Sequence, residues 1–382
     1  MPGRPTFEAR SLFRRVGVGL LLAMLGLASC EGLRSHLGEA PPFFDGGVDA
    51  SLDEDPDGST DGDSGIDAGA DAGRDAGPAE DAGLPPLRWT RLPAPSALAF
   101  YNVGGYRDDG GLTLIVAADS KLLRMSAGTW SVAYQNGTGI PLSALYVSAA
   151  GSVATGGGDV VASCQSDCGD AGAYSESALV GVKGVCGVPG VVYAVGVSAA
   201  LKGTLSKRVA PSGWSQTVAD LGTSAPAACW VAPDGAVLIA ARSKVVRVSN
   251  NVPASEYLRF PAGWSPAQIN AEYFYGLWGS GATVFAAGVG KKIISRSPSG
   301  TWDFVYGSDA GSGGVLLGLA GVDAREVHAL GSGVIRLTSD WAEWEPVSFD
   351  GGFLRAGWAA GPDEVYVVGD DGTHGSLFRG VR

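Results

Sequence analysis

The amino-acid sequence predicts an all-β fold, a seven-bladed β-propeller that follows a signal peptide and a disordered acidic linker. Two observations predict the propeller: short apolar strand patterns broken by Gly, Ser and Asp fill the chain from residue 97 onward, and one of these patterns returns seven times. The 382 residues are 45% hydrophobic and 9% aromatic, which is enough for a packed core and excludes global disorder.

The repeated pattern is a six-residue apolar strand that ends in small residues. Its copies are residues 113–118 (TLIVAA), 152–157 (SVATGG), 191–196 (VVYAVG), 236–241 (AVLIAA), 283–288 (TVFAAG), 326–331 (EVHALG) and 364–369 (EVYVVG). The starts are 39, 39, 45, 47, 43 and 38 residues apart. A period near 42 residues is typical of a propeller blade, and seven such units need about 294 residues. The segment from 86 to 382 has 297.

Other residue types recur at similar positions relative to the repeated strand. Bulky aromatic residues before a Gly-rich turn precede the strand at Tyr146, Trp230, Trp278 and Trp358. An apolar pair followed by arginine comes after the strand, at Arg124, Arg247, Arg296, Arg336 and Arg379. A Trp-bearing strand follows at Trp130, Trp214, Trp302 and Trp344. The last unit has no Trp-bearing strand, and residues 87–92 (LRWTRL) lie outside any unit. We therefore expect this N-terminal segment to pair with the last blade and close the ring, which removes open strand edges.

Residues 125–130 (MSAGTW) and 298–302 (PSGTW) resemble the repeats of Asp-box (BNR-like) propeller proteins. The Asp of that box is absent from both segments. The resemblance thus implies blade architecture and does not imply sialidase-type chemistry.

The first 30 residues have the features of a processing signal. A basic region precedes an apolar run from 16 to 28, which is shorter than the roughly 20 residues that span a bilayer. Residues 27–30 (LASC) resemble a bacterial lipobox, which implies that residues 1–29 are a lipoprotein signal peptide and that Cys30 is lipidated and carries palmitate. Glu31, in place of Asp, favours the outer membrane. The alternative is an ordinary secretory signal in which Cys30 is incidental.

Residues 30–85 predict a disordered tether rich in Asp, Gly and Ala. Residues 31–85 carry a net charge of −13, whereas residues 86–382 carry only −2, so the overall −12 belongs to the tether. We therefore expect a membrane contact through the N-terminal lipid and no nucleic-acid partner. Asp53, Asp55 and Asp57 match half of a calcium loop, but Ser64 replaces its bidentate Glu, so a solvated acidic run is the preferred interpretation.

Four cysteines remain beyond Cys30, and an even number in an exported chain predicts two disulfides with three possible connectivities. Cys164 and Cys168 lie in one polar insertion. Cys186 and Cys229 occupy similar positions relative to the repeated strand in two adjacent units. We favour the pairs 164–168 and 186–229. No histidine or third cysteine lies nearby at ligand spacing, so we expect no metal and no cofactor.

Catalytic residue types are scarce, with three histidines in the chain. His328 falls at a strand position that is Tyr, Phe, Leu or Ile in other units, which indicates packing.

The leading hypothesis is a monomeric, membrane-anchored binding or scaffolding module that presents its face to an envelope protein or glycan, with Trp230, Trp278 and Trp358 as candidate ligand contacts. The alternative is a secreted polysaccharide hydrolase or lyase that uses channel-facing carboxylates. Its candidates precede two strands: Asp323, Glu326, Asp363 and Glu364.

Overall fold

The structure is a computed structural model that describes residues 85–95, 98–210, 213–222, 225–307, 313–324, 326–337, 344–347, 352–370 and 374–382. These residues belong to the second of the two units into which the chain divides, Asp75–Arg382. The expected signal peptide, Cys30 and most of the tether lie outside the described residues, so their boundaries stay predictions. Within the described part of the chain, no helix has the length and apolar character needed to cross a membrane.

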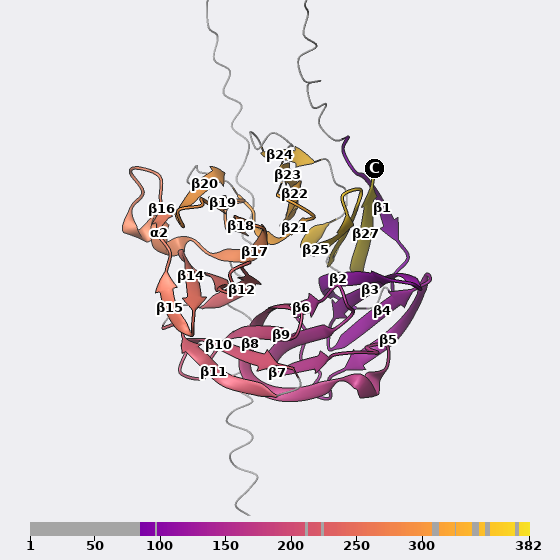
Figure 1. The fold of residues 1–382 in the computed structure, drawn as a ribbon. Coiled ribbons are helices and arrows are strands. Elements are labelled where there is room, and N and C mark those ends of the chain that lie inside the picture. The colour runs from indigo at the N-terminus through magenta and orange to yellow at the C-terminus, as the bar shows by residue number, and fades with distance from the viewer. Residues whose placement is uncertain are drawn as a thin grey trace, which may run out of the picture. The chain divides into compact units, whose positions relative to one another are not determined.

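The described chain folds into six hydrogen-bonded sheets arranged around a central opening (Figure 1), which confirms the all-β propeller. The first sheet contains β2 (Phe100–Asp108), β3 (Gly111–Ala118), β4 (Lys121–Ser126) and β5 (Thr129–Gln135). The second contains β6 (Ala144–Val147), β7 (Val153–Cys164), β8 (Ser175–Val188), β9 (Val191–Val197), β10 (Gly203–Val209) and β11 (Trp214–Asp220), with the 3-10 turn η2 (Ala171–Ala173) between β7 and β8. The third contains β12 (Pro226–Val231), β13 (Val237–Ala241), β14 (Lys244–Ser249) and β15 (Val252–Ser255).

The other three sheets complete the ring. The fourth contains β16 (Leu258–Arg259), β17 (Phe274–Ser280), β18 (Thr283–Gly288), β19 (Ile293–Arg296) and β20 (Trp302–Tyr306), with the helix α2 (Pro266–Ala271) between β16 and β17. The fifth contains β21 (Leu316–Gly321), β22 (Val327–Gly331), β23 (Gly333–Leu337) and β24 (Trp344–Val347). The sixth contains β25 (Phe353–Gly361), β26 (Glu364–Asp370), β27 (Gly375–Val381) and β1 (Arg88–Leu92).

All seven predicted repeat strands are present, as β3, β7, β9, β13, β18, β22 and β26. They occupy six sheets because β8 joins two repeats. Its first half pairs with β7 and its second half pairs with β9. The strand turns between these halves at Gly181, where φ is 62° and an added Cβ would lie 2.2 Å from the Val197 carbonyl oxygen. Glycine is required there because an L side chain is strained at this φ and would also clash.

The two ends of the described chain meet in one sheet. β1 lies antiparallel to β27, from Arg88 opposite Val381 to Leu92 opposite Leu377. Arg382 extends the contact, because its Nε donates a hydrogen bond to the Pro85 carbonyl at 2.7 Å and its guanidinium pairs with Glu326 of the preceding sheet. The N-terminal strand thus contributes the outer strand of the sixth sheet.

The hydrophobic core lies between successive sheets. Phe100 and Leu114 of the first sheet, for example, pack with Tyr366 and Val368 of the sixth. A similar cluster joins the third and fourth sheets and includes Trp302, which is fully buried. Strands that are covered on both faces explain the continuous apolar runs of the sequence.

Candidate functional site in the central channel

A cavity of about 590 Å³ lies in the centre of the ring. The first strand of each of the seven repeats contributes to its wall: β2, β6, β8, β12, β17, β21 and β25. This volume lies in the range of about 300–1,000 Å³ that is typical of small-molecule sites. The cavity is therefore the default candidate for a binding site.

Six of these seven wall strands contain a β-bulge at the same place, near the start of their ladder with the following strand. The bulged residues all line the cavity, and we call this set the bulge mouth: Tyr101, Lys183, Ala227, Tyr275, Leu317 and Arg355. A bulge leaves one residue out of the ladder and redirects its side chain, and bulges are common next to functional sites. The recurring bulge therefore presents six side chains of different chemistry at one end of the channel.

Glycines follow three of the bulged residues and let the wall strands approach closely. A Cβ added to Gly318 would lie 2.7 Å from the Arg355 carbonyl oxygen, and one added to Gly276 would lie 3.1 Å from the Cα of Gly318. The backbone of each bulge thus packs on its neighbour, which holds the bulge mouth in a fixed geometry.

Two positively charged side chains, Lys183 and Arg355, line the cavity, and their surroundings differ. The Arg355 Nε donates a hydrogen bond to Asp370 at 2.7 Å, and its guanidinium lies 5.1 Å from the ring centre of Tyr101. Lys183 is exposed and forms no ion pair with the residues that the structure describes. The cavity wall contains no Asp or Glu among the described residues.

The two tyrosines of the bulge mouth remain protonated at neutral pH. Burial raises the pKa of Tyr275 above its usual value. Burial, followed by the negative charge of Asp119, raises the pKa of Tyr101. Both phenols can therefore donate hydrogen bonds into the channel.

The predicted contacts Trp230, Trp278 and Trp358 line the same cavity, three residues beyond a bulge in each case. Each ring covers a glycine of the next wall strand: added Cβ atoms at Gly279, Gly321 and Gly105 would lie within 3 Å of the respective indoles. The indoles are half-buried and pack between blades. Their role as ligand contacts stays a prediction.

The structure forms the two favoured disulfides. Cys164 pairs with Cys168 beside η2, and Cys186 pairs with Cys229 across two adjacent wall strands, β8 and β12. Cys186 and Cys229 also line the central cavity, so this disulfide joins two strands of the channel wall. Disulfides are typical of oxidising compartments, and the chain is therefore an exported protein.

The carboxylates of the hydrolase or lyase alternative lie elsewhere. Asp323, Glu326, Asp363 and Glu364 are absent from the residues that line the cavity. Glu364 accepts hydrogen bonds at 2.7 Å from both the Tyr366 hydroxyl and Arg379. Burial alone raises the pKa of Glu364, but these hydrogen bonds outweigh it and leave the pKa below its usual value. A carboxylate held in this way is a structural ion-pair partner.

Glu326 and His328 occupy a second buried cluster. Burial raises the pKa of Glu326, although its hydrogen bond with Arg382 acts in the opposite direction. Burial, followed by the charges of Arg336 and Arg382, lowers the pKa of His328 to about 3. The imidazole is therefore neutral and, with 1% of its surface exposed, packs edge-on against Trp89 at 6.0 Å.

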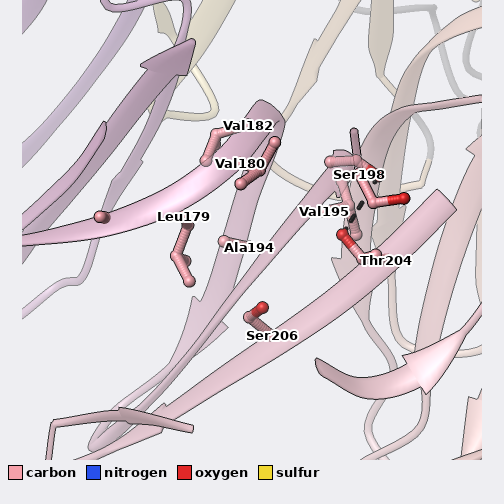
Figure 2. Close-up of a pocket in the computed structure, with 10 residues that line it drawn as sticks. Leu179, Val180, Val182, Ala194, Val195, Ser198, Thr204 and Ser206 are labelled. Carbon is pink, nitrogen blue, oxygen red and sulfur yellow. Dashed lines mark hydrogen bonds between the residues drawn. The ribbon is translucent and has the colours of Figure 1, made fainter. Parts of the chain in front are cut away.

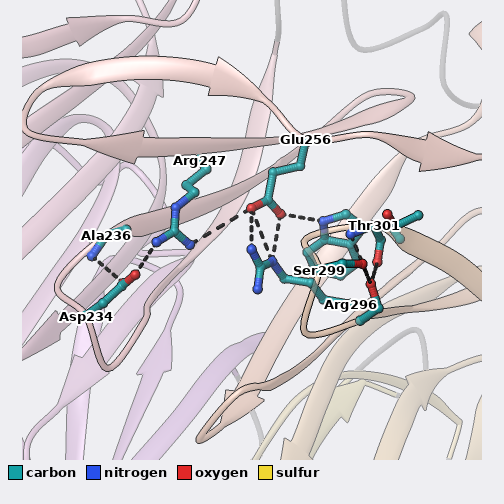
Figure 3. Close-up of polar contacts among 9 residues, drawn as sticks. Asp234, Ala236, Arg247, Glu256, Arg296, Ser299 and Thr301 are labelled. Carbon is teal, nitrogen blue, oxygen red and sulfur yellow. Dashed lines mark hydrogen bonds and ion pairs between the residues drawn. The ribbon is translucent and has the colours of Figure 1, made fainter.

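Two of the recurring arginines, Arg247 and Arg296, join blades (Figure 3). Arg296 of β19 donates hydrogen bonds to both carboxylate oxygens of Glu256, and the Trp302 indole donates a third at 2.6 Å. Arg247 of β14 lies between Glu256 and Asp234. The Glu256 hydrogen bond raises the pKa of Arg296. These arginines are neutralised by carboxylates, so the network links the third and fourth sheets and leaves little charge to bind an anion.

A second pocket lies between β8, β9 and β10 (Figure 2), near Leu179, Val182 and Thr204. Its volume is about 140 Å³, below the usual range for ligands, and its wall has no charged side chain. Within the described residues, no group of three or more His, Cys, Asp or Glu side chains is placed to hold a metal ion.

The sheets and the channel define the class of protein as a β-propeller, and the comparisons with solved structures agree. Virginiamycin B lyase from Staphylococcus aureus superposes with a TM-score of 0.61 at 12% identity, over 78% of this chain and 99% of that one. The WD40 propeller of Doa1 gives 0.53 at 12% identity, over 76% and 95%. YCF48 from Cyanidioschyzon merolae gives 0.55 at 14% identity, over 76% and 98%.

These similarities show the fold alone. No known family matches the chain by sequence, and no curated protein matches it.

Sequence reasoning missed the bulge mouth. Five of its six residues precede the repeated strand by eight or nine residues: Lys183, Ala227, Tyr275, Leu317 and Arg355. An alignment of the repeats on that strand places Lys and Tyr eight residues before it, and Ala, Leu and Arg nine residues before it. Such variation at a repeated position is the signal that could have identified the site.

Proposed function

We propose that the chain is a lipid-anchored binding or scaffolding module of the bacterial cell envelope, which offers the bulge mouth of its channel to an envelope protein or glycan. The observation that carries the proposal is the wall of the central cavity. It combines aromatic rings, apolar side chains and two cations, and it lacks a carboxylate pair for acid–base chemistry. Cys30, in its lipobox-like sequence, supplies the anchor in this proposal, and Glu31 favours the outer membrane.

The fold suits such a role because a propeller holds its wall strands rigidly. Similar folds include the WD40 domain of Doa1 and YCF48 as well as a lyase, so the fold alone does not separate binding from catalysis. The hydrolase or lyase alternative depends on channel-facing carboxylates, and the four predicted carboxylates are not part of the cavity wall. Binding is therefore the function that the site supports better.

Two measurements test this proposal. Cell fractionation should find the wild-type chain with membranes and Cys30→Ser in the soluble fraction, because two or more acyl chains give stable anchoring. Purified full-length protein, incubated with envelope extract and with a glycan array, should retain a ligand without changing it. Membrane association of Cys30→Ser contradicts the anchor, and chain cleavage of a retained polysaccharide contradicts the binding role.

A further inference from the structure

We propose that the bulge mouth and the channel behind it bind a small organic anion with a planar apolar body, and this inference rests on the proposed binding function. The anionic group lies at the bulge mouth, beside Lys183. The apolar body extends along the channel toward the indoles of Trp230, Trp278 and Trp358.

The first step is that the fold does not require the charged and aromatic side chains of the bulge mouth. The same bulge is formed with Ala227 and with Leu317, so the backbone geometry is compatible with a small or an aliphatic residue. Lys183, which forms no ion pair with the described residues, is therefore not explained by the architecture. An exposed cation in the wall of a cavity is a candidate for ligand recognition.

The second step is the hydrogen-bonding character of the bulge mouth. Lys183, Arg355, Tyr101 and Tyr275 offer donors, and both phenols stay protonated because burial raises their pKa. Asp370 accepts one hydrogen bond from Arg355 and holds its guanidinium over the Tyr101 ring. Lys183 has no such carboxylate among the described residues. A donor-rich wall without carboxylates is complementary to an anion.

The third step is the position of the two cations. Arg355 stands on β25 and Lys183 on β8, and two wall strands, β2 and β6, separate them around the ring (Figure 1). The cations therefore approach the channel from different sides. Arg355 is already paired with Asp370, so among the described residues of the mouth Lys183 is the cation left to pair with an anion.

The fourth step is the apolar stretch behind the mouth. The indoles lie three residues beyond the bulge, which is about 10 Å along a strand. The wall between the two levels includes Leu277, Leu319 and the Cys186–Cys229 disulfide. A flat apolar body such as two fused aromatic rings suits this length and composition, because aromatic faces pack in offset or edge-on contacts.

Isothermal titration with matched probes tests the inference. Full-length protein should bind 2-naphthoate about tenfold more tightly than the neutral 2-naphthamide, because a charged hydrogen-bonded pair is stronger than a neutral one. Lys183→Met should reduce this preference to twofold or less and keep the apolar contact. Lys202→Met is the matched control. Lys202 is an exposed lysine beside the same sheet as Lys183, and it pairs with Asp220 outside the cavity.

Several outcomes overturn the inference. Equal affinity for naphthoate and naphthamide refutes the anion site, and equal effects of Lys183→Met and Lys202→Met refute its location. Tighter binding of galacturonate or of a Glu-rich peptide refutes the apolar body. A protein that retains envelope material but does not distinguish the probes refutes this inference alone, whereas discrimination between the probes without envelope retention supports it and refutes the envelope-binding proposal.

Discussion

The two disulfides should stabilise the propeller unequally, because they close loops of very different length. Cys186 and Cys229 are 43 residues apart, and Cys164 and Cys168 are 4 residues apart. The loop-entropy relation gives about 4 kcal/mol at 25 °C for the longer loop and about 2 kcal/mol for the shorter one. The longer disulfide also connects two wall strands from successive repeats, so its loss releases a contact between blades.

The perturbation is to replace both cysteines of one pair by alanine in the full-length chain. The free energy of unfolding, measured by urea denaturation, should fall by about 4 kcal/mol for the Cys186→Ala/Cys229→Ala protein and by about 2 kcal/mol for the Cys164→Ala/Cys168→Ala protein. All four cysteines are buried, so the change from sulfur to methyl affects both variants similarly. An equal loss in the two proteins, or a larger loss for the short loop, refutes the reasoning.

The remaining predictions concern packing, pH and ring closure. Gly105→Ala should lower the free energy of unfolding by about 1–3 kcal/mol, because the new Cβ would lie 2.7 Å from both the Thr113 carbonyl oxygen and the Trp358 ring. Gly137→Ala, which meets open space, should change it little in the same urea titration. The folded pKa of His328 is about 3, far below the 6.5 of the unfolded chain, so the unfolded state alone takes up this proton on acidification. Between pH 7 and pH 5 this histidine should remove about 2 kcal/mol of stability, and His328→Phe should abolish that component of the slope. The same slope in wild type and variant contradicts the buried neutral imidazole. Deleting residues 86–95 should lower the melting temperature or cause aggregation, since β27 loses its partner β1; calorimetry that shows unchanged melting contradicts closure through β1.

Most of the fold could be predicted because it depends on local repetition. Each copy of the six-residue pattern is a strand, and the bulky aromatic positions do precede it on the wall strands, as at Trp278. The shared strand β8 could not be predicted. The sequence from 175 to 188 resembles two short strands, and only the turn at Gly181 and its partners on both sides show that they are continuous.

The candidate site was harder to predict for a physical reason. A β-bulge depends on the hydrogen-bond register of two strands, and register is a property of the pair that no single strand pattern encodes. The sequence around Lys183 and Arg355 therefore does not reveal that both line the channel. The carboxylates Glu326 and Glu364 have the residue type that acid–base chemistry needs, and both precede strands. The structure pairs each of them with an arginine, and the sequence does not reveal this pairing.

Blocking the channel mouth tests whether the mouth binds an envelope component. Ala227→Trp places a large side chain at a bulge position that already tolerates tyrosine in the neighbouring repeat, at Tyr275. Retention of envelope protein or glycan by full-length wild type and Ala227→Trp should be compared after thermal melting confirms that both are folded. We expect the blocked channel to lose at least about nine-tenths of the retained material, which corresponds to a loss of about 1.4 kcal/mol in binding free energy. Equal retention by the two folded proteins would contradict it.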